Sequence, residues 1–222
     1  MKPASSEPSS ESVVLIVDDD PEVCEAIKDL LGSVGLHSKT YASASAFLGS
    51  KLPDQTSCLV VDVRLPGLSG FDIQAELAKV NVNIPIIFIT GYGDVPMSVK
   101  AIKAGAIEFL TKPFREQDLL DAVRAALERD RSRRLYEGKT KDLRNRYNAL
   151  SEREQQVMSF VVAGLLNKQI AAEIGIAEVT TKVHRHNLMK KLDARSLADL
   201  VRKAAVLKLH HAKEYGQLQM IE

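Results

Sequence analysis

The sequence predicts an N-terminal α/β domain, a helical linker and an all-helical C-terminal domain. In the first half, apolar runs of strand length alternate with apolar positions at helical spacing. From position 150 onward no segment has a strand pattern, and between 119 and 147 the composition shifts to Arg, Lys, Asp and Leu. At about 150 residues per domain, the length of 222 residues suggests one or two domains.

Strands of the first domain are expected at Val13–Val17, His37–Tyr41, Cys58–Asp62, Pro85–Thr90 and Ala106–Leu110. The helices between them are expected from Pro21, over Ser43–Leu48, Gly70–Lys79 and Val95–Lys103, and from about Glu116. Asp20 before Pro21 is typical of a helix N-cap. Strands separated by helices form a parallel sheet covered on both faces, so we expect a doubly wound five-stranded sheet.

Beyond this sheet the pattern is helical. The apolar stripe of Leu120, Val123 and Leu127 fades after Glu128 and Gly138 interrupts it, which favours a helical linker over a coiled coil. Four more helices are expected at Glu152–Ala163, Asn167–Ile174, Val179–Leu192 and Ser196–Leu207. The expected boundaries are a disordered tail at 1–11, the α/β domain at 12–128, the linker at 129–147, the helical domain at 148–210 and a tail at 211–222.

Composition excludes several classes of protein. The chain is 45% apolar and 27% charged, which is typical of a globular protein with a core. No apolar run approaches the ~20 residues that a bilayer helix needs, and the N-terminus lacks the apolar segment of a signal peptide. The two cysteines, Cys24 and Cys58, are too few for a disulfide framework or a zinc site. We therefore expect a cytoplasmic protein that does not enter a membrane.

The charge is unevenly distributed along the chain. Residues 1–130 carry 12 basic and 19 acidic side chains, whereas residues 131–222 carry 18 basic and 10 acidic ones. This asymmetry suggests that only the C-terminal half binds a polyanion. The segment Arg131 to Arg146 holds seven of these basic residues, so a solvated linker face is the alternative explanation.

Polar residues stand at the carboxyl ends of four predicted strands, where doubly wound sheets bind ligands. Asp18 and Asp19 follow the first strand, Asp62 ends the third, Thr90 ends the fourth and Lys112 follows the fifth. Three converging carboxylates repel one another, and oxygen ligands open to water suit Mg2+. A carboxylate beside Mg2+ can take up a phosphoryl group, which a hydroxyl and an ammonium group can then hold.

The segments VDDDP, VVDVRLPGLSGFD and ITGYGDVPMSVKAIKAGAIEFLTKPF resemble the CheY-like receiver domain of two-component response regulators, over about Val13 to Leu127. The resemblance implies that Asp62 is the phosphoacceptor and that Mg2+ is bound by Asp62, by Asp19 directly, by Asp18 through water and by the backbone carbonyl of Arg64. It further implies Thr90 as the mobile hydroxyl, Phe109 as the switch aromatic, Lys112 as the phosphate clamp and a cis bond between Lys112 and Pro113.

Phosphatases of the haloacid-dehalogenase type also form an aspartyl phosphate on a parallel sheet. They need a second Asp two residues after the nucleophile as general acid and base, and Arg64 occupies that position here. The chain is therefore not expected to be an enzyme beyond Mg2+-dependent self-phosphorylation from a phosphodonor. Slow self-dephosphorylation, tuned by Arg64 and Tyr92, should follow.

The C-terminal domain contains two helices with a tight connection around Gly175. In the second, TTKVHRHNLMKKL, the apolar Val183 and Leu188 are expected to be buried, alternating with exposed Lys182, Arg185, His186, Lys190 and Lys191. This layout is typical of a recognition helix that packs by one face and enters the DNA major groove by the other. An ordinary helical bundle with a basic surface is the alternative.

The run Leu150-Ser-Glu-Arg-Glu, GLLNKQIA and VTTKVHRHNLMKKL resemble the LuxR-type helix-turn-helix of FixJ/NarL-class response regulators, over about Ala149 to Leu207. The resemblance implies that Lys182, Val183 and His186 face base edges and that Lys168, Thr180, Arg185 and Lys190 contact phosphates. Glu152 and Glu154 would be structural. Ala177 and Glu178 depart from the pattern, which usually has a Ser or Thr cap there, His184 could pack or contact DNA, and His210 and His211 receive no function.

Together these features predict a phosphorylation-dependent transcription regulator that binds promoters and activates transcription. Its expected partners are a sensor histidine kinase, double-stranded promoter DNA, RNA polymerase and, once phosphorylated, a second copy of the chain. The signal is expected to change the face formed by the fourth and fifth strands and the helix Val95–Lys103, which pairs two receivers or releases the DNA-binding domain. The alternatives are a regulator that binds DNA without phosphorylation and a module that sequesters a kinase or another protein.

Overall fold

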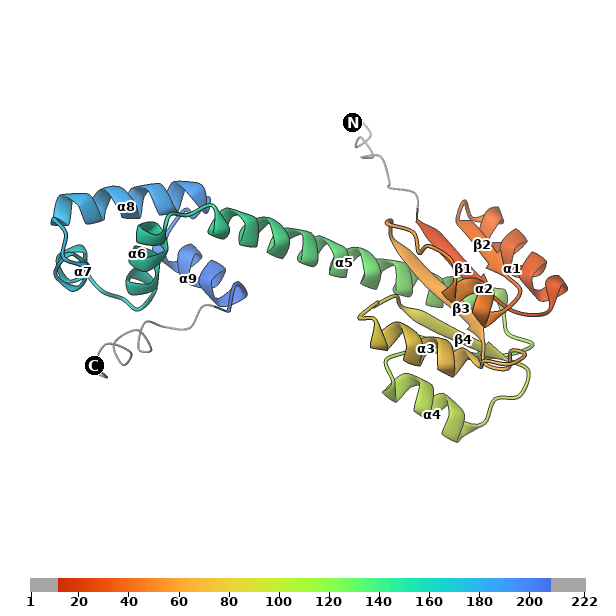
Figure 1. Cartoon of the computed structure of the whole chain (residues 1–222). Coiled ribbons are helices and arrows are strands. Elements are labelled where there is room, and N and C mark those ends of the chain that lie inside the picture. The colour runs from red at the N-terminus through yellow and green to blue at the C-terminus, as the bar shows by residue number, and fades with distance from the viewer. Residues whose placement is uncertain (1–11, 209–222) are drawn as a thin grey trace, which may run out of the picture. The chain divides into compact units, whose positions relative to one another are not determined.

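The computed structural model describes residues 12–208, so the predicted tails at 1–11 and 211–222, together with His210 and His211, lie outside the described residues. The chain divides into two compact units between Arg134 and Leu135, called here the N-terminal and the C-terminal unit (Figure 1). Within residues 12–208, no helix is long and apolar enough to cross a membrane.

The N-terminal unit is built on a five-stranded parallel sheet, as predicted, and its strand order is β2-β1-β3-β4-β5. Its strands are β1 (Val13–Val17), β2 (His37–Tyr41), β3 (Ser57–Asp62), β4 (Ile86–Thr90) and β5 (Glu108–Thr111). The last strand begins later than the predicted Ala106–Leu110, because the amide of Ala106 closes the end of the preceding helix by bonding to the carbonyl of Ala101.

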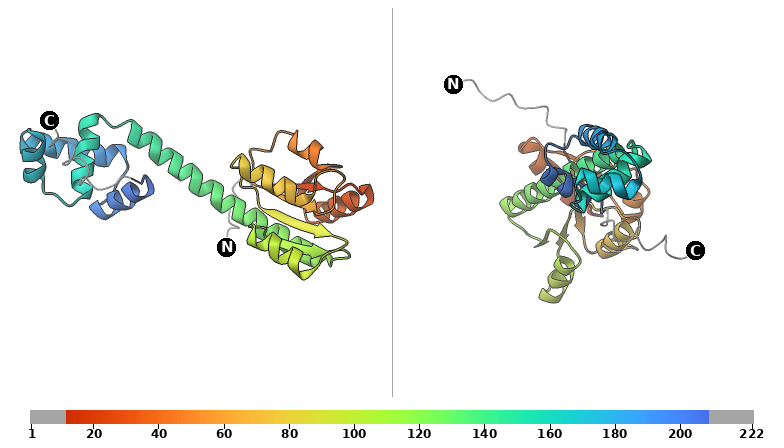
Figure 2. Two further views of the ribbon diagram at one scale, coloured as in Figure 1. Left: turned by 60° about the horizontal axis from the view of Figure 1, so that its bottom comes forward. Right: turned by 90° about the vertical axis from the view of Figure 1, so that its left-hand side faces the viewer.

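Helices cover both faces of this sheet (Figure 2). They are α1 (Pro21–Ser33), α2 (Ala44–Leu48), α3 (Gly70–Lys79), α4 (Val95–Lys103) and α5 (Glu116–Asn148). Because successive strand residues point to opposite faces, Val13, Leu15 and Val17 pack with α2, α3 and α4, whereas Val14 and Ile16 pack with α1 and α5. The carboxyl ends of the central strands thus meet at one edge between these two layers.

Helix α5 spans 33 residues and continues through Gly138, so the glycine interrupts the apolar pattern but not the helix. A glycine inside a helix costs about 1 kcal/mol relative to alanine, which is too little to break a long helix on its own. The predicted stripe of Leu120, Val123 and Leu127 is buried against the sheet. Further along, Leu143 and Tyr147 pack against the core of the C-terminal unit.

A buried carboxylate fixes the last turn of α5 that contacts the sheet. Asp130 is fully buried and accepts a hydrogen bond from the backbone amide of Ser57, at the start of β3, at 3.0 Å. The guanidinium groups of Arg133 and Arg134 donate to the same carboxylate at 2.5 and 2.7 Å. Three donors therefore compensate the buried charge and connect the helix to the sheet.

The C-terminal unit contains the four predicted helices, α6 (Glu152–Val162), α7 (Asn167–Ile174), α8 (Glu178–Lys191) and α9 (Leu197–Val206). Helix α6 begins with a capping box in which Ser151 and Glu154 satisfy each other's backbone amides. Helix α7 ends at Gly175, whose φ of 67° is a conformation that glycine adopts without strain. This turn directs the chain into α8, which packs across α6 and α7.

Candidate functional site

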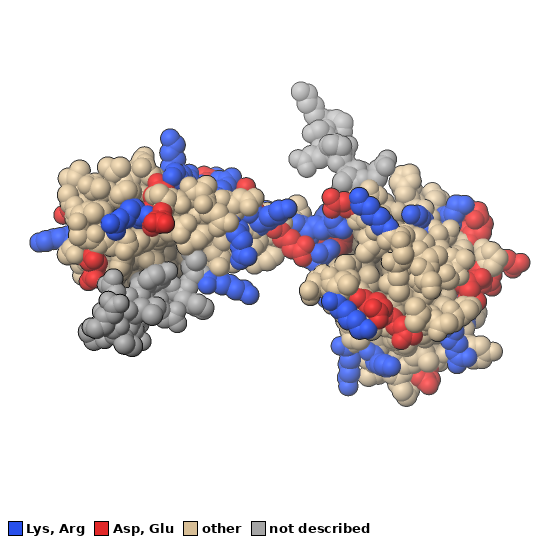
Figure 3. Space-filling view, viewed as in Figure 1, with Lys and Arg blue, Asp and Glu red and all other residues tan. Residues whose placement is uncertain are grey.

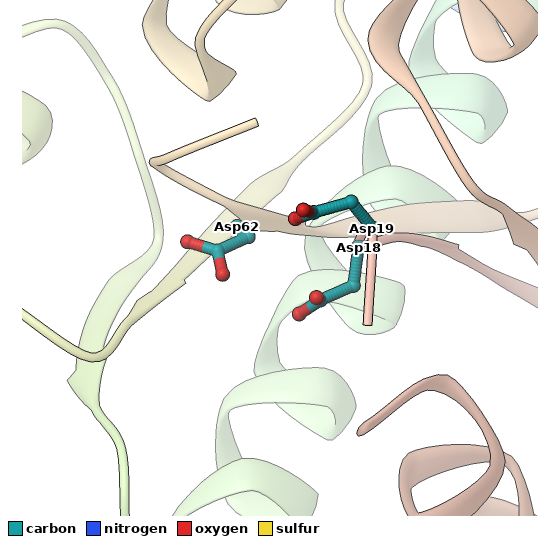
Figure 4. Close-up of side chains that lie close together, drawn as sticks. All are labelled: Asp18, Asp19 and Asp62. Carbon is teal, nitrogen blue, oxygen red and sulfur yellow. The ribbon is translucent and has the colours of Figure 1, made fainter. Parts of the chain in front are cut away.

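Three aspartates meet at the carboxyl ends of β1 and β3 (Figure 4). Val17 pairs with Val61 in the sheet, so Asp18 and Asp62, the next residue in each chain segment, are neighbours across the two strands. Asp18 and Asp62 are buried, Asp19 is exposed, and one oxygen of each carboxylate lies within 4.8 Å of the others. The backbone amide of Asp20 donates to Asp18 Oδ1, and Asp20 itself caps α1 as predicted.

The ammonium group of Lys112 lies between two of these carboxylates. Its Nζ is 2.6 Å from Asp18 Oδ2 and 2.8 Å from Asp62 Oδ2. Burial raises the pKa of Asp18 despite the hydrogen bond from Lys112. Burial works to lower the pKa of Lys112, but the hydrogen bonds to both carboxylates outweigh it and raise that pKa. Lys112 is therefore cationic at neutral pH. Its ammonium group is held beside the carboxylate of Asp62, where it would pair with a negatively charged group attached to that carboxylate.

Thr90 and Phe109 flank the same edge of the sheet. Thr90 is fully buried, and its Oγ1 accepts a hydrogen bond from the amide of Tyr92 at 3.3 Å. The half-buried ring of Phe109 lies 6.5 Å from the ring of Phe88, centroid to centroid. A Cβ atom at Gly93 would come within 2.9 Å of the Phe109 ring, so the loop after β4 passes directly against the aromatic side chain.

Arg64 and Tyr92 lie two residues after Asp62 and Thr90, respectively. The backbone amide of Arg64 donates to Asp62 Oδ1 at 3.0 Å, and its guanidinium group lies 4.6 Å from the centre of the Tyr92 ring. Both side chains are exposed. The peptide bond between Lys112 and Pro113 is cis, as the receiver resemblance implied.

Helix α8 of the C-terminal unit has one buried and one exposed face. Thr181, Leu188 and Leu192, the residue that follows the helix, are buried against the other helices. The expectation that Val183 is buried is wrong, because its side chain is 53% exposed. At 3.6 residues per turn, position 183 lies roughly opposite Leu188 and Leu192 on the helix, which explains the exposure.

The residues expected to contact DNA lie on the exposed side of the C-terminal unit or at its margin. Lys168, Thr180, Lys182, Val183, His186 and Lys190 are exposed, whereas Arg185 is half-buried and donates from Nη1 to Asn167 Oδ1 at 3.0 Å. On the face drawn in Figure 3, separate Lys and Arg side chains project from this unit, with patches of Asp and Glu among them. Asp and Glu side chains are more prominent on the N-terminal unit in the same view.

Two acidic residues of this unit have structural partners. Glu154 is buried and pairs with Lys191 at 2.6 Å, and this bond and the Ser151 amide outweigh burial and lower the pKa of Glu154. Glu178 pairs with Lys182 at 3.0 Å, an i,i+4 contact that its spacing could have revealed but that sequence reasoning missed. Ala177 caps α8 without a side-chain hydrogen bond, and His184 is half-buried.

Comparison with known proteins agrees with this arrangement. Residues 14–124 match the response regulator receiver domain, and residues 148–204 match the bacterial regulatory proteins of the luxR family. Nodulation protein W of Bradyrhizobium diazoefficiens is 54% identical over 202 residues, which cover 91% of this chain and 89% of that protein. The transcriptional regulatory protein FixJ of Rhizobium meliloti is 43% identical over 86% of this chain and 94% of its own.

Among solved structures, the response regulator StyR superposes with a TM-score of 0.81 at 49% identity, over 88% of this chain and 99% of that one. A receiver-type sheet followed by a LuxR-type helix-turn-helix defines a DNA-binding response regulator. The chain belongs to this family, in the FixJ/NarL class. A receiver domain implies a histidine kinase partner, and the luxR-family domain implies binding to DNA.

Proposed function

We propose that Asp62 accepts a phosphoryl group from a sensor histidine kinase. The observation that carries this proposal is the ammonium of Lys112, held 2.6 and 2.8 Å from the carboxylates of Asp18 and Asp62. A carboxylate oxygen of Asp62 attacks phosphorus and forms an O–P bond while the P–N bond to the kinase histidine breaks. Lys112 then moves its hydrogen bond from the carboxylate to a phosphoryl oxygen and compensates the added charge.

Magnesium is the proposed cofactor. Three carboxylates and one ammonium leave two negative charges uncompensated, and all three carboxylates offer oxygen ligands, which fits this ion. Asp19, Asp62, Asp18 through water and the backbone carbonyl of Arg64 would hold it. When bound, Mg2+ supplies positive charge that stabilises the transferring phosphoryl group. The same groups support self-phosphorylation from a small phosphodonor and slow self-dephosphorylation, with the paired side chains of Arg64 and Tyr92 limiting the approach of water.

Thr90 and Phe109 carry the signal away from Asp62 in this proposal. The hydroxyl of Thr90 leaves the Tyr92 amide for a phosphoryl oxygen, and Phe109 moves into the space that Thr90 vacates. The loop at Gly93 must follow, because it contacts the ring of Phe109. The face of β4, β5 and α4 then pairs two receivers or releases the DNA-binding domain at 148–210 from the receiver at 12–128. The phosphoryl group shifts this equilibrium only by its preference for the active form.

The dimer then brings two α8 helices to adjacent half-sites of promoter DNA and recruits RNA polymerase to activate transcription. Lys182, Val183 and His186 face base edges, and Lys168, Thr180, Arg185 and Lys190 bind phosphates. The exposed positions of six of these seven side chains support the assignment. Arg185, held by Asn167, is pre-oriented by that hydrogen bond. Residues 129–147 act as the linker.

The test is binding to the upstream DNA of regulated genes with and without acetyl phosphate and Mg2+. Phosphorylation should tighten specific binding about tenfold, within the range of coupling free energies for such switches. Asp62→Asn should keep the weaker affinity under both conditions. Equal affinities in the wild type would favour phosphorylation-independent binding, and the absence of any salt-sensitive specific complex would favour a sequestering module.

A further inference from the structure

The exposed face of α8 carries a second valine, which no role assigned so far explains. Val179, the second residue of the helix, is 71% exposed, more than Val183 at 53%. Successive residues turn by about 100°, so positions 179, 183, 186 and 190 fall within one narrow stripe. This stripe lies opposite the buried residues Thr181 and Leu188. Val179 therefore points outward in the same direction as the residues that are proposed to contact bases.

The surroundings of Val179 fit DNA better than another protein. The exposed face around the stripe carries the cationic side chains of Lys182 and Lys190, with Lys168 exposed on the preceding helix. The acidic neighbour Glu178 is already paired with Lys182. In helix-turn-helix proteins the N-terminal residues of the recognition helix contact base edges, and Val179 lies in the first turn of α8.

A valine can read only one feature in the major groove. It has no hydrogen-bond donor or acceptor in its side chain, so the C5-methyl group of thymine is its complement. From these positions we infer that Val179 contacts a thymine methyl group in each half-site and extends the base-reading set by one residue toward the helix N-terminus. This inference rests on the proposed DNA binding by α8.

The test removes single methyl groups from the DNA. The full chain, treated with acetyl phosphate and Mg2+, is used to select its binding sequence from a random duplex pool. Each thymine of the selected site is then replaced in turn by deoxyuridine, and affinity is measured by fluorescence anisotropy at fixed salt. The proteins compared are the wild type, Val179→Ala and Val80→Ala. Val80 is a similarly exposed valine, at 66%, that follows α3 in the N-terminal unit.

Each half-site should contain one thymine that depends on its methyl group. For the wild type and Val80→Ala, replacing this single thymine by deoxyuridine should weaken binding about fourfold, which corresponds to the loss of one buried methyl group. For Val179→Ala the same replacement should change the affinity less than about twofold. Identical deoxyuridine profiles for the wild type and Val179→Ala would overturn the inference alone. If no sequence is selected at all, the proposed DNA binding fails, and the inference fails with it.

Discussion

Lys112 is the residue on which the proposed chemistry depends most. Its ammonium group joins Asp18, which follows β1, to Asp62 at the end of β3, although it is itself contributed by the loop after β5. Two opposite charges at hydrogen-bond distance keep it protonated despite partial burial. The position of the cation before any phosphoryl group arrives means that little reorganisation is needed during transfer.

Replacing Lys112 by Ala should lower the rate of phosphorylation from acetyl phosphate about 100-fold, since one preorganised donor to the transferring group is lost. Binding of Mg2+ should be retained or strengthened, because a competing positive charge is removed from the carboxylates. Initial rates by mass spectrometry and Mg2+ titration by calorimetry would check both parts. Lys28→Ala is the matched control, because Lys28 pairs on the surface with Glu25. An unchanged rate in Lys112→Ala would refute the role as clamp.

The stability of the C-terminal unit should depend on pH through the carboxyl group of Glu154. Its pKa is lowered in the folded state from 4.5, since the bonds from Lys191 and Ser151 outweigh burial. The stabilisation is therefore complete above pH 4.5 and is lost as the pH falls through the lower folded-state pKa. Urea denaturation followed by circular dichroism should show this loss for the wild type and a flatter profile for Glu154→Gln. Equal slopes in this pH range would contradict the assignment.

At the scale of elements, the apolar pattern predicted the structure well: continuous apolar runs marked the strands that are buried on both faces, and helical spacing marked the helices. The apolar runs of β1, β3 and β4 and the helices α6 to α9 appear within a residue or two of their expected ranges. The start of β5 was predicted two residues too early, because a helix-ending turn occupies Ala106. The prediction that Val183 is buried was wrong, because its apolar character suggested burial. Apolar residues that serve an exposed face look the same in sequence as core residues.

The bond between Asp130 and Ser57 could not have been predicted, because Ser57 lies 73 residues away and contributes a backbone amide. Such long-range bonds depend on the folded geometry, and no spacing of residues in the sequence reveals them. By contrast, the cluster of Asp18, Asp19 and Asp62 was predictable, since the ends of parallel strands meet at one edge. The Lys112 contacts followed from the same rule.

Asp130→Ala should destabilise the N-terminal unit by about 2–4 kcal/mol, because it leaves the Ser57 amide and two arginines without their buried acceptor. Asp121→Ala on the same helix is the control: Asp121 pairs with Arg124 at the surface, and its loss should cost less than about 1 kcal/mol. Guanidinium denaturation of both variants would compare them. A similar small effect for both would show that the buried cluster does not stabilise the unit.

For the whole molecule, the division into two units separates the chemistry from its readout. The acidic cluster and Lys112 belong to the N-terminal unit, and the exposed stripe of α8 belongs to the C-terminal unit. The charge asymmetry of the sequence anticipated this division, with the acidic excess before position 131 and the basic excess after it. We propose that the phosphorylation of Asp62 couples the two units.

The most direct test of the account is therefore the intact mass of the full chain after incubation with acetyl phosphate and Mg2+, with Asp62→Asn in parallel. The wild type should gain a single phosphoryl group and the variant none, and omission of Mg2+ should abolish the gain. A phosphoryl group on Asp62→Asn would place the acceptor elsewhere. No addition to a folded wild-type protein would contradict the phosphoacceptor assignment and leave a regulator that binds DNA without phosphorylation.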